Sequence, residues 1–298
     1  MSTKNRALVT GCAGFIGSHL TDSLLENGFH VIGLDNLSTG KEENIVQHVD
    51  NESFQFIKGD IRDLSLFEMI AEVDFVFHFA ALARIQPSIE DPITSNFVNH
   101  VGTLNVLEYC RRNKAKIIFS GSSSIYAGDK LPIIESDTKD PKSPYALQKL
   151  QAEQYIELYG KLYDLEYTIL RYFNVYGERQ ITEGAYSAIV GIFLQQKAEG
   201  KPLTITNDGE QRRDFTYVRD VAMANFMARN WPRGQFNIGT GTNYSVNELA
   251  DAVGGEKEYI GERIGEARVT LADNEPAKIQ GWSPTVDIKD WIHDQVQG

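Results

Sequence analysis

The stretch Ala7-Leu8-Val9-Thr10-Gly11-Cys12-Ala13-Gly14-Phe15-Ile16-Gly17 decides the fold of this chain. An apolar run enters three glycines with the spacing G-x-x-G-x-x-G, and an amphipathic segment follows at once. This pattern predicts a strand, a tight turn and the start of a helix. Such a turn lets the backbone approach a pyrophosphate, and the helix N-terminus offers it unpaired N–H groups and a positive dipole end. The stretch therefore predicts a dinucleotide site in the first unit of the fold.

The residues after the turn narrow the choice of dinucleotide. Leucines with helical spacing run to Gly28, and residues 29–34 then form a second apolar run that ends at Asp35. A carboxylate about 20 positions past the glycines is placed to accept from the hydroxyls of the adenosine ribose. No arginine follows immediately, as a 2′-phosphate would require, so we favour NAD over NADP. The alternative is a glycine turn that binds nothing, with Asp35 a solvated loop carboxylate.

The composition limits the classes of protein to which this chain can belong. The chain has 298 residues, of which 42% are hydrophobic and 23% charged, and this suits a globular protein with a sizeable core. A net charge of −12 without a basic cluster argues against a nucleic-acid partner or an acidic membrane surface. The two cysteines, Cys12 and Cys110, match no metal-ligand spacing, so we expect no metal site and a cytoplasmic location. No apolar run approaches ~18 residues, so we expect neither a membrane span nor a signal peptide.

Apolar strand-like runs alternate with helical patterns through the first 170 or so residues. This alternation predicts an α/β fold with a doubly wound parallel sheet of the Rossmann type over residues 1–173. A smaller C-terminal α/β domain over 174–298 is expected, with segments that return to the sheet. Strands are expected near 6–10, 29–34, 54–58, 74–79, 115–120, 166–171 and 202–206; helices are expected near 16–27, 64–72, 93–113, 144–163, 185–199 and 218–229.

Two Tyr-x-x-x-Lys pairs occur, and only one lies in a helical context. Tyr126 and Lys130 are separated by a turn sequence, whereas Tyr145 and Lys149 open the segment after Pro144. On a helix, positions i and i+4 share a face, so the ammonium of Lys149 can sit beside the phenol of Tyr145 and favour the phenolate. A phenolate near working pH can act as a general base. The alternative is a solvated surface Tyr and Lys.

A serine cluster, Ser120 to Ser124, follows the apolar run 116–119. A hydroxyl at the carboxyl end of a parallel strand can bind a substrate hydroxyl and pass a proton to a nearby tyrosine. The alternative is a serine-rich turn whose hydroxyls cap their own backbone.

Taken together, these motifs resemble the extended short-chain dehydrogenase/reductases of the nucleotide-sugar epimerase and dehydratase group. The resemblance covers essentially the whole chain. Its landmarks are residues 10–17, 35–40, 59–63, the serine cluster, Tyr145 with Lys149, and residues 170–177, 213–215 and 281–284. It implies that Ser122 completes a catalytic set with Tyr145 and Lys149.

The resemblance also narrows the reaction. The 4,6-dehydratases that this chain resembles carry Asp and Glu after the catalytic Ser or Thr, and the decarboxylases keep a Glu there, whereas this chain has Ser123 and Ser124. It therefore implies C4 epimerisation of a UDP-sugar through a transient 4-keto intermediate, with NAD tightly bound and regenerated in each turnover. The alternatives are an NADPH-dependent 4-ketoreductase, a UDP-glucuronate 4-epimerase and, more remotely, a non-catalytic NAD-sensing scaffold.

The family positions imply two sets of contacts. The cofactor set comprises Gly11, Gly14, Phe15, Ile16, Gly17, Asp35, Asn36, Ser38, Gly40, Asp60, Ile61, Phe79, Ala80, Ala81, Ser120, Tyr145, Lys149, Tyr172 and Val175. The substrate set comprises Ser88, Ser122, Tyr145, Asn174, Thr204, Thr206, Arg213, Arg263, Glu266 and Thr270. Within it, arginines suit the diphosphate because a guanidinium contacts phosphate oxygens at two points.

The sugar is inferred from resemblance at two further places. Thr270 falls where epimerases restricted to hexoses carry a Tyr, so it leaves room for an N-acetyl group, and residues 88–96 resemble the matching stretch of N-acetylhexosamine 4-epimerases. UDP-GlcNAc/UDP-GalNAc is therefore the favoured pair, with UDP-Glc/UDP-Gal as further candidates. Similar proteins pair the segments 93–113 and 144–163 as a four-helix bundle, so we expect a homodimer. Ala146, Leu150, Tyr155 and Leu158 could form its seam or belong to the core.

Overall fold

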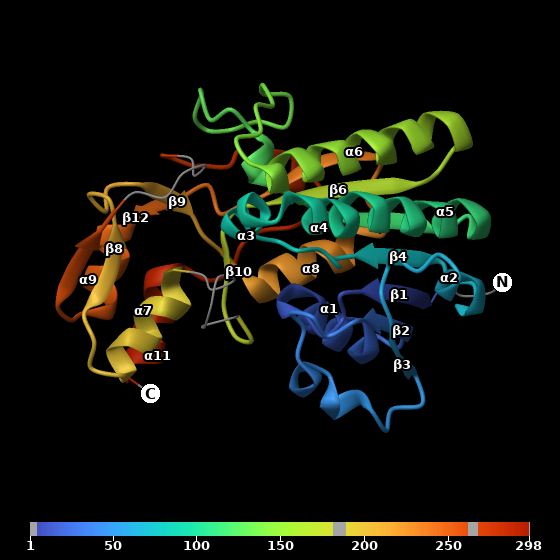
Figure 1. Cartoon of the computed structure of the whole chain (residues 1–298), viewed down its shortest axis with the longest axis horizontal. Coiled ribbons are helices and arrows are strands. Elements are labelled where there is room, and N and C mark those ends of the chain that lie inside the picture. Colours follow the sequence, from blue (N-terminus) through green and yellow to red (C-terminus); the bar gives the residue numbers. More distant parts are fainter. Residues whose placement is uncertain (1–4, 181–188, 262–267, 298) are drawn as a thin grey trace.

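A seven-stranded, all-parallel sheet forms the centre of the molecule (Figure 1). The computed structural model describes residues 5–180, 189–261 and 268–297. The strand order is β11-β6-β5-β4-β1-β2-β3, which is the doubly wound arrangement that the alternating pattern predicts. The strands are β1 (Arg6–Thr10), β2 (His30–Asp35), β3 (Phe54–Lys58), β4 (Phe75–His78), β5 (Lys116–Ser122), β6 (Tyr167–Tyr172) and β11 (Gly234–Ile238).

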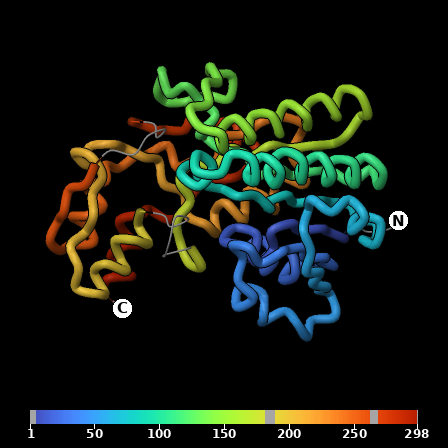
Figure 2. The backbone as a smooth tube through the Cα atoms, viewed as in Figure 1, coloured from blue at the N-terminus to red at the C-terminus, as the bar shows by residue number. Residues whose placement is uncertain are grey.

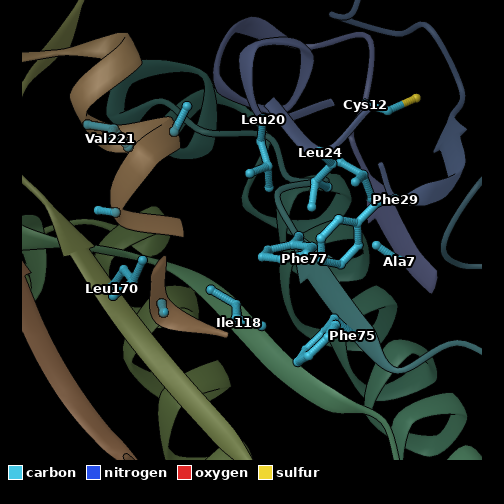
Figure 3. Packing of buried hydrophobic residues seen from close by; sticks show 14 of the residues in the cluster. Ala7, Cys12, Leu20, Leu24, Phe29, Phe75, Phe77, Ile118, Leu170 and Val221 are labelled. Atoms are coloured by element: carbon cyan, nitrogen blue, oxygen red, sulfur yellow. The ribbon is translucent and has the colours of Figure 1, made fainter. Parts of the chain in front are cut away.

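Both faces of this sheet are apolar because both are covered by helices. Along β1, Ala7 and Val9 pack into one core cluster and Leu8 into another, as the alternation of side chains along a strand requires. The first cluster lies under α1 (Phe15–Glu26) and α8 (Val218–Ala228), which pack against each other (Figure 3). The second lies under α5 (Thr103–Asn113) and α6 (Pro144–Tyr163).

The expected helix over 93–113 is not a single α-helix. It consists of α4 (Pro92–Asn96), a π-helical stretch (Phe97–Gly102) and α5. In the π-helical stretch, Asn99 exchanges hydrogen bonds with the backbone of Leu82, and its amide donates to Gln148 Oε1 at 2.8 Å. Gly102 is also crowded, because a Cβ there would lie 2.5 Å from Ile61 Cδ1. These contacts favour a local change of helix type, as often happens near functional sites.

Another expected helix, over 64–72, is reduced to the short α2 (Leu66–Met69). Two helices that were not expected, α3 (Ile85–Glu90) and the short α10 (Glu275–Ile279), pack against α6 and β11 respectively. Helices α9 (Val246–Val253) and α11 (Ile288–Gln297) were not expected either. The 144–163 helix was predicted with the same bounds as α6.

The second half of the chain builds a lobe beside the carboxyl ends of the strands (Figure 1). Its helices α7 (Ile189–Ala198), α9 (Val246–Val253) and α11 (Ile288–Gln297) enclose a separate apolar cluster. Three two-stranded sheets accompany them: β7 (Val175–Tyr176) with β10 (Thr216–Tyr217), β8 (Leu203–Thr206) with β13 (Lys257–Ile260), and β9 (Arg212–Asp214) with β12 (Asn243–Ser245).

The chain passes between the two halves several times (Figure 2). After β10 the chain returns to the central sheet, where α8 covers α1 and β11 pairs with β6. It then enters the lobe again through β12, α9 and β13, returns to the sheet with α10, which packs beside β11, and ends in the lobe with α11. The two ends of the chain consequently lie toward opposite ends of the molecule (Figure 2). Across the part of the chain that the structure describes, no helix has the length and apolar character needed to cross a membrane.

Candidate active site

A cavity of about 600 Å³ lies between the carboxyl ends of the strands and the lobe. The sequence-predicted residues in its wall are Gly11, Gly14, Phe15, Ile16, Gly17, Asp35, Asn36, Ser38, Asp60, Ile61, Phe79, Ala80, Ala81, Ser120, Ser122, Tyr145, Tyr172, Asn174, Val175, Thr206, Arg213 and Thr270. The fold thus brings most of the predicted cofactor and substrate contacts to one continuous space.

Four other predicted residues lie behind this wall. The Ser88 hydroxyl accepts from the backbone N–H of Tyr145 at 3.1 Å, and Gly40 packs against the carboxylate of Asp35. Thr204 is engaged by the side chain of Gln196 through both its N–H and its hydroxyl. The fourth is Lys149, whose contacts follow below. Arg263 and Glu266 lie outside the described residues.

The glycine turn leaves space that fits a pyrophosphate. Gly11 has φ +74°, and a Cβ on it would lie 2.8 Å from the backbone nitrogen of Ala80. A Cβ on Gly17 would lie 2.1 Å from the carbonyl oxygen of Gly11, so the helix can start close under the turn only with glycine there. Helix α1 begins after Gly14, and no side chain caps it. Its first N–H groups therefore face the cavity as an anion site.

Acidic side chains at the ends of β2 and β3 fit the adenosine part of a dinucleotide. Asp35 accepts from the backbone N–H groups of Ala13 at 3.0 Å and Leu37 at 2.8 Å, which fixes its orientation. Burial raises the pKa of this carboxyl, and the two hydrogen bonds oppose that rise. Asp60 accepts from the Asn36 amide at 2.9 Å, and its ion pair with Arg62 holds its pKa below the usual range. The residues present therefore fit NAD.

Tyr145 and Ser122 meet at the end of β5. Helix α6 starts with Pro144 in its first turn, and the Ser143 hydroxyl accepts from the N–H of Ala146, so Tyr145 enters the cavity from a fixed helix N-terminus. The phenol of Tyr145 and the Ser122 hydroxyl line the same cavity, and their interaction lowers the pKa of the phenol. The Ser122 oxygen lies 2.9 Å from Ser124 Oγ, which makes a short line of hydroxyls. This arrangement can bind a substrate hydroxyl and move its proton.

The protonation of Tyr145 is set by opposing effects. Burial raises the pKa of the phenol, while the hydrogen bond from Ser122 and the positive charge of Arg84 lower it. Lys149 follows Tyr145 by one helical turn. Its ammonium donates to the carbonyl oxygen of Ser120 at 2.8 Å and lies 4.8 Å from the centroid of the Phe119 ring. Burial lowers the pKa of Lys149 to about 8, and the nearby Glu153 carboxylate opposes this change.

The substrate side of the cavity carries Asn174, Arg213 and Thr270. The Asn174 amide donates to the carbonyl oxygen of Asp214 at 2.9 Å and to Thr270 Oγ1 at 3.2 Å. Thr270 is buried, and its hydroxyl also accepts from the N–H of Asp214. Arg213 donates to the carbonyl oxygens of Arg212 and Arg268, each at 3.1 Å. These contacts hold an amide, a small hydroxyl side chain and a guanidinium at fixed places in the wall.

Several residues of the wall were not predicted from the sequence. Arg84, Gln86 and Lys142 approach from around the start of α3 and the loop before α6, and Gln211 and Phe215 come from the lobe. Arg84 follows the end of β4, so the general rule that ligands lie beyond strand ends could have identified it. Within the described ranges, no three His, Cys, Asp or Glu side chains gather in a way that could hold a metal.

A buried ion pair lies beside the end of β5, next to Gly121. Arg171 Nη2 lies 2.7 Å from Glu153 Oε2, and the two side chains are only 3% and 2% exposed. Arg171 also donates to Tyr126 Oη at 2.7 Å and to the carbonyl oxygen of Glu135 at 2.9 Å. A Cβ on Gly121 would lie 2.9 Å from Glu153 Oε1, so the strand residue beside Ser122 is glycine because the pair packs there.

Comparisons with known proteins agree with this site. The model of the NAD dependent epimerase/dehydratase family matches residues 7–239. A Methanocaldococcus jannaschii protein named for UDP-glucose 4-epimerase is 44% identical and covers 96% of this chain and 95% of its own length.

Two solved structures are also similar over nearly the whole chain. UDP-N-acetylglucosamine 4-epimerase from Methanobrevibacter ruminantium M1, in complex with UDP-N-acetylmuramic acid, has a TM-score of 0.93 and 35% identity, covering 100% of this chain and 98% of that one. UDP-glucuronic acid 4-epimerase from Bacillus cereus, in complex with UDP-glucuronic acid and NAD, has a TM-score of 0.90 and 33% identity, covering 98% and 99%. This chain therefore belongs to the NAD-dependent epimerase/dehydratase family, and NAD is its cofactor.

Proposed function

We propose that this enzyme inverts C4 of a UDP-N-acetylhexosamine and so interconverts UDP-GlcNAc and UDP-GalNAc. The observation that carries the proposal is the single cavity that joins the glycine turn, the Ser122–Tyr145 pair and the wall around Thr270. Its relatives are named as UDP-sugar 4-epimerases but for three different sugars, so they support the reaction more firmly than the sugar.

Tyr145 acts as the general base toward the 4′-hydroxyl of the sugar. Ser122 orients that hydroxyl and shares the proton, since it lines the same cavity and interacts with the phenol. Bound NAD supplies the reversible removal and return of hydride at C4. Lys149 is held by the Ser120 carbonyl behind the cavity wall, where it positions the end of β5 and contributes positive charge beside the site. Between the two hydride transfers the flat 4-keto sugar turns its other face to the site.

Two features favour epimerisation over elimination and reduction. Ser123 and Ser124 stand where similar dehydratases carry carboxylates, so no acid–base pair for the removal of water is present at those positions. The position of Asp35 favours NAD over NADP. A 4-ketoreductase would consume one NADPH in each turnover, whereas an epimerase returns the hydride to the sugar. An epimerase therefore needs no added cofactor once NAD is bound.

Thr270 supports the N-acetylated sugar. Its short side chain is fixed at the wall by Asn174 and by the backbone N–H of Asp214, so position 270 itself brings no bulky ring into the cavity. The diphosphate is assigned to Arg213, and the uracil to the neighbourhood of Thr206, whose hydroxyl accepts from Gln211 at 2.9 Å.

The test is a panel of UDP-sugars given to purified protein without added cofactor, with products identified by NMR. UDP-GlcNAc should yield UDP-GalNAc. Brisk turnover of UDP-galactose or UDP-glucuronate without turnover of UDP-GlcNAc would refute the choice of sugar. A requirement for stoichiometric NADPH would refute epimerisation.

We also propose a homodimer through α4, the π-helical stretch and α6. Ala146 is fully buried and Leu150 packs into the core, so these two of the four expected seam residues belong to the protomer. The exposed apolar side chains of this face are Ile93, Phe97, Tyr155, Leu158 and Leu162, and Phe97 and Leu162 are 52% and 62% exposed. Light scattering should give twice 33.4 kDa, and Leu162→Glu should give monomers, whereas Met69→Glu on α2, at a side chain that is 75% exposed, should not. A single-chain mass for the unchanged protein would refute the dimer.

A further inference from the structure

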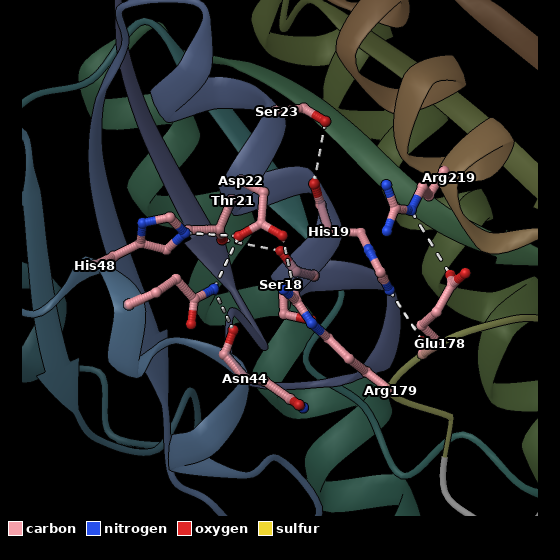
Figure 4. A network of polar contacts seen from close by, with 12 residues as sticks. Ser18, His19, Thr21, Asp22, Ser23, Asn44, His48, Glu178, Arg179 and Arg219 are labelled. Carbon is pink, nitrogen blue, oxygen red and sulfur yellow. Dashed lines mark hydrogen bonds and ion pairs between the residues drawn. The ribbon is translucent and has the colours of Figure 1, made fainter.

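A group of polar contacts outside the cavity joins helix α1 to the segment that follows β7 (Figure 4). We call His19, Asp22, Glu178 and Arg179 the α1 clasp. Arg179 Nη1 lies 2.8 Å from Asp22 Oδ2, and His19 Nε2 lies 3.0 Å from the carbonyl oxygen of Glu178. Asp22 also binds His48 Nε2 through its other oxygen, at 2.6 Å. The clasp therefore connects segments more than 150 residues apart in the sequence.

The α1 clasp continues the contacts that close one side of the cavity. Phe15, His19 and Asp22 are spaced i, i+4 and i+7, so they share one face of α1. Phe15 lines the cavity, and its ring meets that of His19 edge-on at 6.4 Å between centroids. Across the joint, Val175 also lines the cavity and packs into the same apolar cluster as Phe15. The joint thus runs from the cofactor cavity outward to the ion pair.

The backbone at the other side of the joint is held in an unusual conformation. Arg179 has φ +62°, a region that L-residues other than Asn and Asp seldom adopt, and Gly177 has φ +137°. Glu178 between them is fixed by the Tyr217 hydroxyl, which donates to both of its carboxylate oxygens at 2.8 and 2.9 Å. Unfavourable backbone conformations persist where surrounding contacts determine them, and they gather at functional sites. Here the contacts of Glu178 fix the direction in which the Arg179 side chain extends toward α1.

We infer that the Asp22–Arg179 ion pair slows the release of NAD by holding α1 against the segment after β7. The inference rests on the proposed function, in which NAD is used and restored in every turnover and is therefore best retained. Neither side chain lines the cavity, so both are positioning residues. Helix α1 carries the glycine turn at its N-terminus, so separation of α1 from residues 178–179 widens the cavity beside Phe15 and Val175.

The test measures the dissociation rate of NAD from the folded protein. The full chain, loaded with NAD where it purifies without it, is diluted and desalted at intervals, and the NAD that remains is released by heat and quantified. We expect about tenfold faster loss in Asp22→Asn and in Arg179→Met, and no further increase in the double variant, because paired groups do not act additively. Arg179→Lys should restore part of the retention, and kcat at saturating NAD should change less than twofold.

Arg233→Met is the matched control. Arg233 is 33% exposed, against 26% for Arg179, and pairs with Asp164 at the opposite ends of the strands, away from the cavity. It should leave NAD release unchanged. Unchanged release in both clasp variants, equal effects in the control, or additive effects in the double variant would overturn the inference. If the variants release NAD in the expected order of rates but the protein shows no epimerisation, only the proposed function is refuted.

Discussion

Glu153→Gln should destabilise this protein far more than the loss of one hydrogen-bond acceptor explains. The variant keeps the shape of the side chain but leaves the Arg171 guanidinium, 3% exposed, without its counter-charge. Breaking a buried ion pair on one side costs about 3–5 kcal/mol. Since folded proteins are stable by about 5–15 kcal/mol, this loss would be a large share of the free energy of unfolding.

The double variant Glu153→Met/Arg171→Met separates charge from packing. Replacing both partners removes the uncompensated charge, so most of the cost should disappear. The Tyr126 hydroxyl and the Glu135 carbonyl then lose the donor that Arg171 supplied, at about 1–3 kcal/mol for an unsatisfied buried group. We therefore expect the double variant to be more stable than Glu153→Gln.

Urea unfolding followed by circular dichroism measures these differences, with NAD at a fixed saturating concentration because bound ligand adds to stability. Glu108→Gln is the control, since Glu108 pairs with Arg111 at 2.7 Å on the surface, where such pairs contribute about 0–1 kcal/mol. A cost below about 1 kcal/mol for Glu153→Gln, or a double variant as unstable as the sum of its single variants, would refute the reasoning.

Three further predictions concern the retention of NAD, stability at low pH and the general base. Gly17→Ala should fold without retaining NAD, because its Cβ would lie 2.1 Å from the Gly11 carbonyl oxygen; normal NAD content after purification would contradict this. His78 is fully buried between two threonine hydroxyls, and burial lowers its pKa to about 3. Its contribution to stability is therefore present above about pH 6.5 and is lost as the pH falls toward 3, so His78→Gln should flatten the acid side of the stability curve measured by urea unfolding. Tyr145→Phe should abolish turnover in the NMR assay while NAD stays bound, and retained turnover would remove Tyr145 from its role as base.

The central sheet was predictable because its signals are local. Continuous apolar runs and the glycine turn identify β1, α1 and β2, and the Tyr145–Lys149 spacing identifies α6. The predicted strands agree with the structure to within one or two residues over the first 172 positions. Parallel order then brings Asp35 and Ser122 to the same edge, as the strand-end rule requires.

The remainder depends on tertiary contacts that a single sequence does not carry. The short strands of the lobe have two to four residues, too few for a period to emerge, although β8 was expected. Asn99 binds Leu82 and Gln148 across three segments, and these partners, which lie far apart in the sequence, accompany the π-helical stretch. The contact of Lys149 with the Ser120 carbonyl could not be predicted for the same reason, because that carbonyl belongs to β5 and Lys149 to α6.

The return of the chain to the central sheet makes the two halves mutually dependent for folding. A fragment that ends at residue 173 would lack α8 and β11, so the apolar face of α1 and the free edge of β6 would meet water. Exposed apolar surface and an unpaired strand edge both promote aggregation. Nor can the lobe be removed by one cut, since the chain enters it three times, after β6, after β11 and after α10. The cavity wall holds residues from Gly11 to Thr270, so it forms only when both halves of the chain have folded together.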